Sequence, residues 1–169
     1  NRNVDLVLVP ELPFDLEGPN GLLATVGQRL AENLSTVMVF AEGAGQDHLE
    51  PTGEVDASGN VLFADIGTFL CQLFIERFDL KKSSAVKYVD PSYMIRSMPA
   101  SALDSIFCGY LAHAAAHAGM AGQTGMAVGR ANGKFTHIPL DELVKQRKTI
   151  DPEGKLWLSV LESTNQPFY

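Results

Sequence analysis

Two short apolar runs, separated by a stretch with helical periodicity, constrain most strongly which fold this chain can adopt. Val4–Val9 is mostly apolar and ends at Pro10, and Thr36–Ala41 is a second run of the same kind. Runs of this length and composition are typical of buried strands in a parallel sheet. Between them, Leu22–Asn33 carries apolar residues at helical spacing, with Asn20 as a candidate N-cap. Strand, helix and strand in this order predict a right-handed βαβ crossover, and therefore an α/β fold.

Further helices and one hairpin follow from the rest of the sequence. Asp65–Phe78 predicts an amphipathic helix, with Asp65 as its N-cap or as an acid of its first turn, and Lys81–Ser84 predicts a polar turn. Ala102–Ala121 predicts a long helix that is buried in the protein rather than placed in a membrane, because polar residues interrupt it. The remaining expected elements are strands Met126–Val128 and Phe135–Ile138 joined by Asn132-Gly133, a short helix Leu140–Val144 and a last helix around Trp157–Leu161.

Composition excludes several classes of function. The chain has 169 residues, which is enough for about one domain, and a net charge of −7. That charge disfavours nucleic acid and anionic membranes as partners. Cys71 and Cys108 lie in apolar helical patterns and are expected to be buried free thiols. His113 and His117 are four residues apart, but no glutamate lies between them, and we expect helix histidines rather than a metal site.

Two places carry chemistry that points to a ligand. Glu11 follows the first strand, at the sheet edge where α/β proteins bind ligands, and is either an acceptor for a hydroxylated ligand or an exposed loop acid. Lys87–Ser97 brings a cation, a phenol and a guanidinium within ten residues, and is expected to form a strand that leads into a bend at Pro91. Such a segment either grips a phosphate or carboxylate or is an edge strand with solvated charges. The residues alone leave both alternatives open.

Several separated segments resemble the 6-phosphofructokinase family, in particular its plant and trypanosomatid-type ATP-dependent branch. They are Val9–Phe14 (VPELPF), Ala41–Asp47 (AEGAGQD), Lys87–Ser97 (KYVDPSYMIRS), Ala118–Gly125 (AGMAGQTG) and Leu161–Pro167 (LESTNQP). The resemblance extends over nearly the whole chain, and the Lys87–Ser97 segment is its most specific part. It implies a Rossmann-like three-layer α/β/α phosphofructokinase fold, of which this chain would be an incomplete, C-terminal portion.

The resemblance also implies a substrate site for fructose 6-phosphate. Glu11 matches an acid that accepts hydrogen bonds from sugar hydroxyls, and Tyr93 and Arg96 match contacts to the sugar and its 6-phosphate. Met94 and Ile95 lie between them in the same motif. Lys87 matches a cation that often reaches a phosphate across a subunit interface, and stands where bacterial relatives have arginine.

The family's nucleotide-binding GGDGT segment, its TIDND segment with the catalytic base, and its MGR segment are absent from this sequence. No catalytic residue, cofactor site or metal ligand is therefore assigned to this chain. Mg²⁺ and ATP are expected to bind to a chain or segment that carries the nucleotide-binding portion. Residues 1–96 would be part of the sugar-phosphate domain, 97–150 would cross back to the nucleotide-binding domain, and 151–169 would return.

The whole enzyme would transfer a phosphoryl group from Mg-ATP to the 1-hydroxyl of fructose 6-phosphate in glycolysis. A pyrophosphate-dependent enzyme and a non-catalytic, sugar-phosphate-binding regulatory chain are the alternatives. The family further implies a homo-oligomer in the cytoplasm, with the plastid as the alternative compartment.

Overall fold

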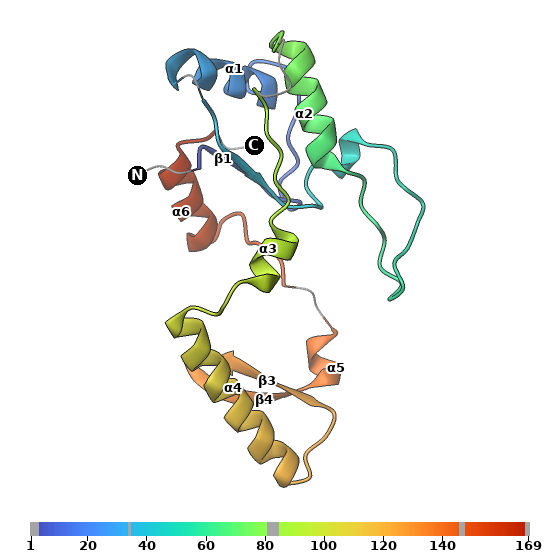
Figure 1. The fold of residues 1–169 in the computed structure, drawn as a ribbon, viewed down its shortest axis with the longest axis vertical. Coiled ribbons are helices and arrows are strands. Elements are labelled where there is room, and N and C mark those ends of the chain that lie inside the picture. Colours follow the sequence, from blue (N-terminus) through green and yellow to red (C-terminus); the bar gives the residue numbers. More distant parts are fainter. Residues whose placement is uncertain (1–3, 34, 81–84, 146–147, 168–169) are drawn as a thin grey trace. The chain divides into compact units, whose positions relative to one another are not determined.

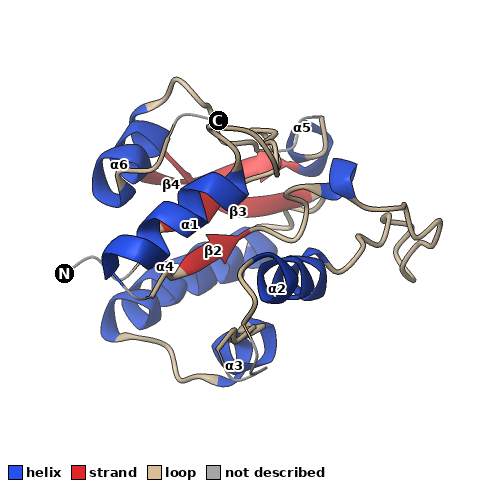
Figure 2. Ribbon diagram, turned by 90° about the horizontal axis from the view of Figure 1, so that it is seen from above, coloured by secondary structure: helices blue, strands red, loops and turns tan. Residues whose placement is uncertain are grey.

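A computed structural model describes residues 4–33, 35–80, 85–145 and 148–167. The chain divides into two compact units (Figure 1). The first unit consists of Asn1–Val89 and Thr149–Tyr169, and the second consists of Asp90–Lys148. Helices and strands occur in both (Figure 2), so the predicted α/β class is confirmed at the level of a mixed fold with small sheets. The three-layer arrangement stays a prediction.

The first unit begins with the predicted strand–helix–strand sequence. Strands β1 (Leu6–Leu8) and β2 (Met38–Phe40) pair in parallel, and helix α1 (Leu22–Asn33) connects them. Leu6 and Leu8 are buried because they alternate with Val7 and so point to one face of the sheet. The core against that face is completed by α1 and by the next helix; its buried members are Leu6, Leu8, Phe14, Leu22, Val26, Ala44, Ile66 and Leu70.

The second strand is less buried than its sequence predicts. Val39, at the centre of β2, is 48% exposed, and none of the three residues of β2 is buried. Among the described residues the sheet contains only β1 and β2, so β2 has a strand neighbour on one side only. The prediction of a fully buried second strand is therefore wrong for this chain.

Helix α2 (Ile66–Arg77) follows a mostly exposed excursion. The excursion contains a 3₁₀ turn, η1 (Gln46–His48), and an isolated antiparallel bridge between Val55 and Val61. Asp65 caps α2 as predicted, since its carboxylate accepts a hydrogen bond from the Thr68 amide at 3.0 Å. The polar turn predicted for Lys81–Ser84 lies outside the described residues.

The last helix, α6 (Lys155–Thr164), places Gln166 at the edge of β1 that does not pair with β2. Asn165 ends the helix in the left-handed conformation (φ 53°). The buried side-chain amide of Gln166 then pairs with the backbone of Val7 in both directions: the Val7 amide donates to Oε1 at 2.8 Å, and Nε2 donates to the Val7 carbonyl at 3.0 Å. This amide satisfies backbone groups that a neighbouring strand would otherwise pair with.

The second unit is a long helix against a hairpin, preceded and followed by a short helix. It contains α3 (Ser92–Ser97), α4 (Ala102–Met120), β3 (Met126–Ala131), β4 (Lys134–Pro139) and α5 (Leu140–Leu143). The predicted Asn132-Gly133 turn is confirmed, with φ of 50° and 80°, and β3 and β4 pair in antiparallel fashion. Helix α4 packs on the hairpin through Phe107 and Tyr110, whose rings each lie 5.6 Å from that of Phe135.

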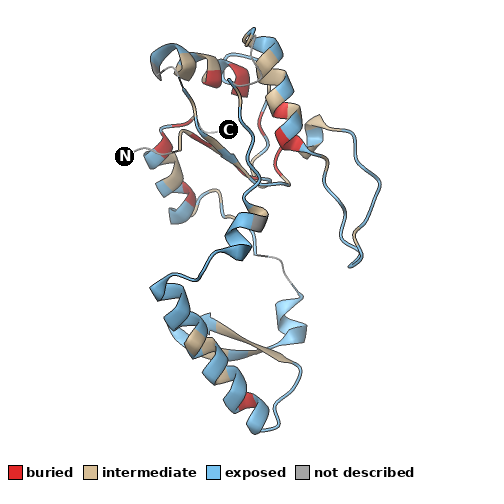
Figure 3. Cartoon of the chain, in the orientation of Figure 1, coloured by how far each residue is buried: buried red, intermediate tan, exposed pale blue. Residues whose placement is uncertain are grey.

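Three expectations for this part of the chain need correction. The predicted strand within Lys87–Ser97 does not form: residues 87–91 have no regular structure, and 92–97 are helical. Helix α4 is mostly exposed (Figure 3), with Ala118 its one buried residue, so it is not a buried helix in this chain. Cys71 and Cys108 are both free, as predicted, but Cys71 is only partly buried and Cys108 is exposed.

The cap of α2 provides a test of local stability. Replacing Asp65 by alanine should lower the free energy of unfolding by about 1 kcal/mol in urea denaturation at pH 7. Hydrogen bonds from the Thr68 hydroxyl and the Thr68 amide lower the pKa of Asp65 from its ordinary value. The cap is therefore fully stabilising at neutral pH, and its contribution falls as the pH drops below about 4 towards the lowered pKa. Asp65→Ser keeps a neutral acceptor and should lack this acid dependence; an alanine variant as stable as wild type would contradict the assignment.

Candidate functional site

The carboxyl ends of β1 and β2 meet at one edge of the sheet, because the strands are parallel. The Ala41 amide donates to the Leu8 carbonyl at 3.0 Å, which extends the pairing to the point where both strands end. Glu11 lies three residues beyond Leu8. The loop after β2 lies beside the loop after β1, since a Cβ built on Gly43 would be 3.5 Å from the ring of Pro10. Glu11 is thus placed at the edge where α/β proteins bind ligands, as predicted.

These two loops are held by side chains that the sequence did not single out. Gln46 donates to the carbonyls of Glu42 (2.9 Å) and Ala64 (3.0 Å), and its Oε1 accepts from the Ala64 amide. His48 Nε2 lies 2.7 Å from the Phe14 carbonyl oxygen. These contacts give the loops a fixed shape and leave Gln46 a structural role.

Gly45 is required by the same packing. Its φ is 63°, and a Cβ at this position would lie 2.8 Å from the ring of Phe14. Only glycine satisfies both conditions. Gly45 thus lets the loop approach an aromatic side chain of the core.

The carboxylate of Glu11 is partly committed within the protein. Its Oε1 accepts a hydrogen bond from the backbone amide of Ile150 at 3.0 Å. Its Oε2 is buried and has no hydrogen-bond partner among the described residues. Glu11 is therefore not a freely exposed loop acid. Its second oxygen is buried and receives no hydrogen bond within the described part of the chain.

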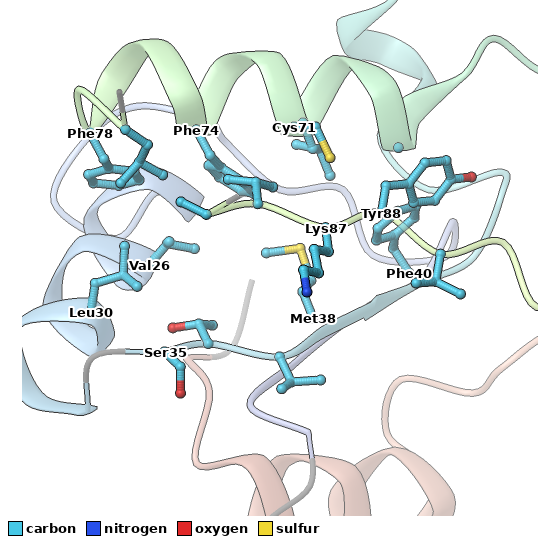
Figure 4. A pocket seen from close by; sticks show the side chains of 18 residues that line it. Val26, Leu30, Ser35, Met38, Phe40, Cys71, Phe74, Phe78, Lys87 and Tyr88 are labelled. Carbon is cyan, nitrogen blue, oxygen red and sulfur yellow. The ribbon is translucent and has the colours of Figure 1, made fainter. Parts of the chain in front are cut away.

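Lys87 lies beside a pocket of about 520 Å³ in the first unit (Figure 4). The pocket is bounded by β2, α2 and the segment 85–89, and its walls are mainly apolar, with Met38, Phe40 and Phe74 among them. The side chain of Lys87 points into the pocket in this view, although the residue as a whole is exposed. Tyr88 packs on Phe40, with ring centroids 5.9 Å apart.

The motif that contains Tyr93 and Arg96 forms a helix. The Asp90 carboxylate accepts from the Ser92 amide at 2.9 Å, and the Ile95 amide donates to the Pro91 carbonyl at 2.9 Å, so the proline starts α3 instead of bending a strand. Met94, Ile95 and Arg96 are exposed.

The six predicted substrate residues are divided between the two units. Glu11 and Lys87 belong to the first unit, and the segment Tyr93–Arg96 belongs to the second. Within the first unit, Glu11 is at the loops that follow the strands, and Lys87 is at the pocket beside β2. Their convergence on one ligand stays a prediction.

The described part of the chain was predicted to hold no metal ligand of its own. Among the described residues, no group of three or more histidine, cysteine, aspartate and glutamate side chains could hold a metal ion. These side chains therefore do not fit a Mg²⁺ site of their own. Within the same residues, no helix is long and apolar enough to cross a membrane.

Comparisons with known proteins identify the family. The chain is 46% identical, over 98% of its length, to an ATP-dependent 6-phosphofructokinase of Amycolatopsis methanolica, of which it covers 38%. It is 42% identical over its full length to ATP-dependent 6-phosphofructokinase 1 of Arabidopsis thaliana (37% covered), and 38% identical over 97% of its length to an ATP-dependent 6-phosphofructokinase of Trypanosoma brucei brucei (34% covered). No family model matches the chain.

The resemblance seen in the sequence is thereby confirmed, and it includes plant and trypanosome proteins. The chain belongs to the 6-phosphofructokinase family. It corresponds to a part of such a protein, since it spans a little over a third of the length of the curated relatives it matches.

The two thiols should differ in reactivity. Partial burial, and to a smaller extent the charge of Asp65, raise the pKa of Cys71, whereas Cys108 is exposed on α4. Because the thiolate is the reactive form, the 169-residue chain should show one fast and one slow equivalent with a thiol reagent at pH 8. Cys108→Ser should remove the fast phase and Cys71→Ser the slow one; the opposite assignment would contradict the burial of these residues.

Proposed function

We propose that this chain is the fructose 6-phosphate-binding, C-terminal part of an ATP-dependent 6-phosphofructokinase. The observation that carries the proposal is the similarity over 97–100% of the chain to proteins named as ATP-dependent 6-phosphofructokinases. The complete enzyme would transfer the phosphoryl group to the 1-hydroxyl of the sugar phosphate. The names of the relatives favour ATP over pyrophosphate as the donor.

The substrate roles follow from the chemistry of the side chains. The guanidinium of Arg96 offers a planar fork of donors that matches phosphate oxygens, and its exposure on α3 leaves that fork available. Glu11 contributes an acceptor for a sugar hydroxyl through Oε2. Tyr93 supplies a phenol, Lys87 supplies a mobile positive charge, and Met94 and Ile95 provide apolar surface beside them.

The donor half of the reaction is proposed to lie in a chain or segment that carries the nucleotide-binding portion. ATP and Mg²⁺ would be held there, because this chain lacks both the glycine-rich phosphate segment and a set of metal-ligating side chains in its described part. Phosphoryl transfer depends on positioning and charge neutralisation around the phosphates. This chain would contribute the positioning of the acceptor sugar.

In the proposed arrangement, residues 1–96 and 151–169 belong to the sugar-phosphate domain, and residues 97–150 cross back to the nucleotide-binding domain. The exposed apolar side chains of α4 support the second assignment: Leu103 is 80% exposed and Ile106 is 58% exposed. These residues are spaced to share one helix face. A face of this kind is normally covered by protein.

A homo-oligomer in the cytoplasm or the plastid completes the proposal. Two of the Arabidopsis relatives are named chloroplastic, whereas the names of the Amycolatopsis protein and of Arabidopsis 6-phosphofructokinase 1 carry no such term. Oligomer formation is carried over from the family.

Arg96 provides the direct test of substrate binding. In the full-length protein, Arg96→Ala should weaken fructose 6-phosphate binding by about 10- to 100-fold in calorimetry, because hydrogen bonds to charged groups contribute about 1.5–3 kcal/mol. Arg130→Ala is the matched control, since Arg130 is an exposed arginine of the same unit outside the motif. Equal loss in both variants would contradict the role of Arg96. Turnover with pyrophosphate and none with ATP would overturn the donor.

The exposed face of α4 provides a second test. Ile106→Glu should destabilise the full-length protein by about 2 kcal/mol, because a charge would be buried against the rest of the polypeptide. Ser105→Glu introduces the same charge one residue earlier, at an exposed polar position, and should change stability by less than about 0.5 kcal/mol. A tolerated Ile106→Glu would show that nothing covers this face.

A further inference from the structure

The carboxylate of Glu11 lies at the sheet edge proposed to bind substrate. It also contacts the segment with which the chain returns to the first unit. The chain leaves the first unit after Val89 and re-enters it at Thr149. The next residue, Ile150, donates its backbone amide to Glu11 Oε1 at 3.0 Å, across a separation of 139 residues. Glu11 therefore holds the returning segment at the ends of the strands.

Between described residues, few other polar contacts hold this segment. The Gly154 amide donates to the Asp151 carbonyl at 3.0 Å, and the Glu153 amide donates to the Asp151 carboxylate at 3.1 Å, but both bonds are local to the turn before α6. Among the described residues, residues 149–154 are connected to the loops that follow the strands by the hydrogen bond from Ile150 to Glu11.

The same contact decides which oxygen of Glu11 is left for a ligand. Oε1 is occupied, whereas Oε2 is buried without a partner in the described part of the chain. A buried carboxylate oxygen without a donor is unfavourable, and a ligand hydroxyl is a donor that would satisfy it. A glutamate side chain also has several rotatable bonds, and the amide of Ile150 reduces the freedom that binding would otherwise have to remove.

We propose that the backbone amide of Ile150 is a positioning group for Glu11. It orients the carboxylate so that Oε2 accepts a hydrogen bond from one ligand hydroxyl. Ligand binding in turn strengthens the hydrogen bond from the Ile150 amide to Glu11. The identity of the ligand as fructose 6-phosphate rests on the proposed function, whereas the bond from Ile150 to Glu11 does not.

Amide hydrogen exchange in the full-length protein measures the bond directly. Glu11→Ala should raise the exchange rate of the Ile150 amide by about 10- to 100-fold, the range expected for losing a hydrogen bond to a charged group. Glu11→Gln keeps an acceptor and should leave this amide largely protected. The Ala41 amide, which pairs with Leu8 in the same unit, reports whether the variant is folded. Fast exchange at Ile150 in the wild type, or unchanged exchange in Glu11→Ala, overturns the proposal.

A pair of substitutions at position 150 separates the backbone amide from the side chain. Ile150→Pro removes the donor, and Ile150→Ala keeps it while shortening the side chain. The proline variant should bind fructose 6-phosphate about tenfold more weakly than the alanine variant, with the Ala41 amide equally protected in both. Equal affinities in two folded variants would exclude a positioning role.

Ligand titration tests the coupling and keeps the two proposals apart. Fructose 6-phosphate should slow exchange of the Ile150 amide in the wild type and have no such effect in Glu11→Ala. Binding without slower exchange overturns the coupling. Absence of binding to the wild type contradicts the proposed function instead, and the bond is then judged from the comparison of wild type with Glu11→Ala alone.

Discussion

The pairing of β1 with its two neighbours is the interaction on which the first unit depends. One edge of β1 pairs with β2, and the other edge is closed at Val7 by the side-chain amide of Gln166. Its inner face carries Leu6 and Leu8 into the core. A strand of three residues has few hydrogen bonds to offer, so each of these partners contributes substantially to its placement. The end of the chain is consequently part of the same structural unit as its beginning.

The parallel pairing has a chemical consequence at the ends of the strands. It brings the loops that follow β1 and β2 together, and Gln46 and His48 hold these loops in one conformation through backbone carbonyls. Glu11 emerges beside them with one oxygen bound to Ile150 and one without a partner among the described residues. A carboxylate that is oriented by the protein before a ligand arrives is better suited to binding than a mobile one.

The second unit obeys a different constraint. Its hairpin is closed by a turn that needs positive φ at two positions, and α4 packs on it through Phe107 and Tyr110 around Phe135. Leu103, on the same helix, remains exposed. An apolar helix with so little buried surface is what a part of a longer protein presents, and the chain does span only a little over a third of its relatives.

The sequence by itself determined the elements whose causes are local. Periodicity located α1 and α2, the Asp65 cap was readable from its position, and Asn132-Gly133 specified the hairpin, because backbone conformation there depends on neighbouring residues. The family was equally readable, since its motifs are stretches of adjacent residues.

Only the tertiary structure decided which residues are buried and which distant residues contact one another. The exposure of β2 and α4 depends on which other elements are present to cover them, and an apolar pattern cannot report that. The helix after Pro91 was missed because a strand and a short helix of this composition look alike in sequence. The partner of Glu11 lies 139 residues away and contributes a backbone amide, which every residue except proline possesses. No side-chain pattern could reveal it, because the contact is created by the path of the chain.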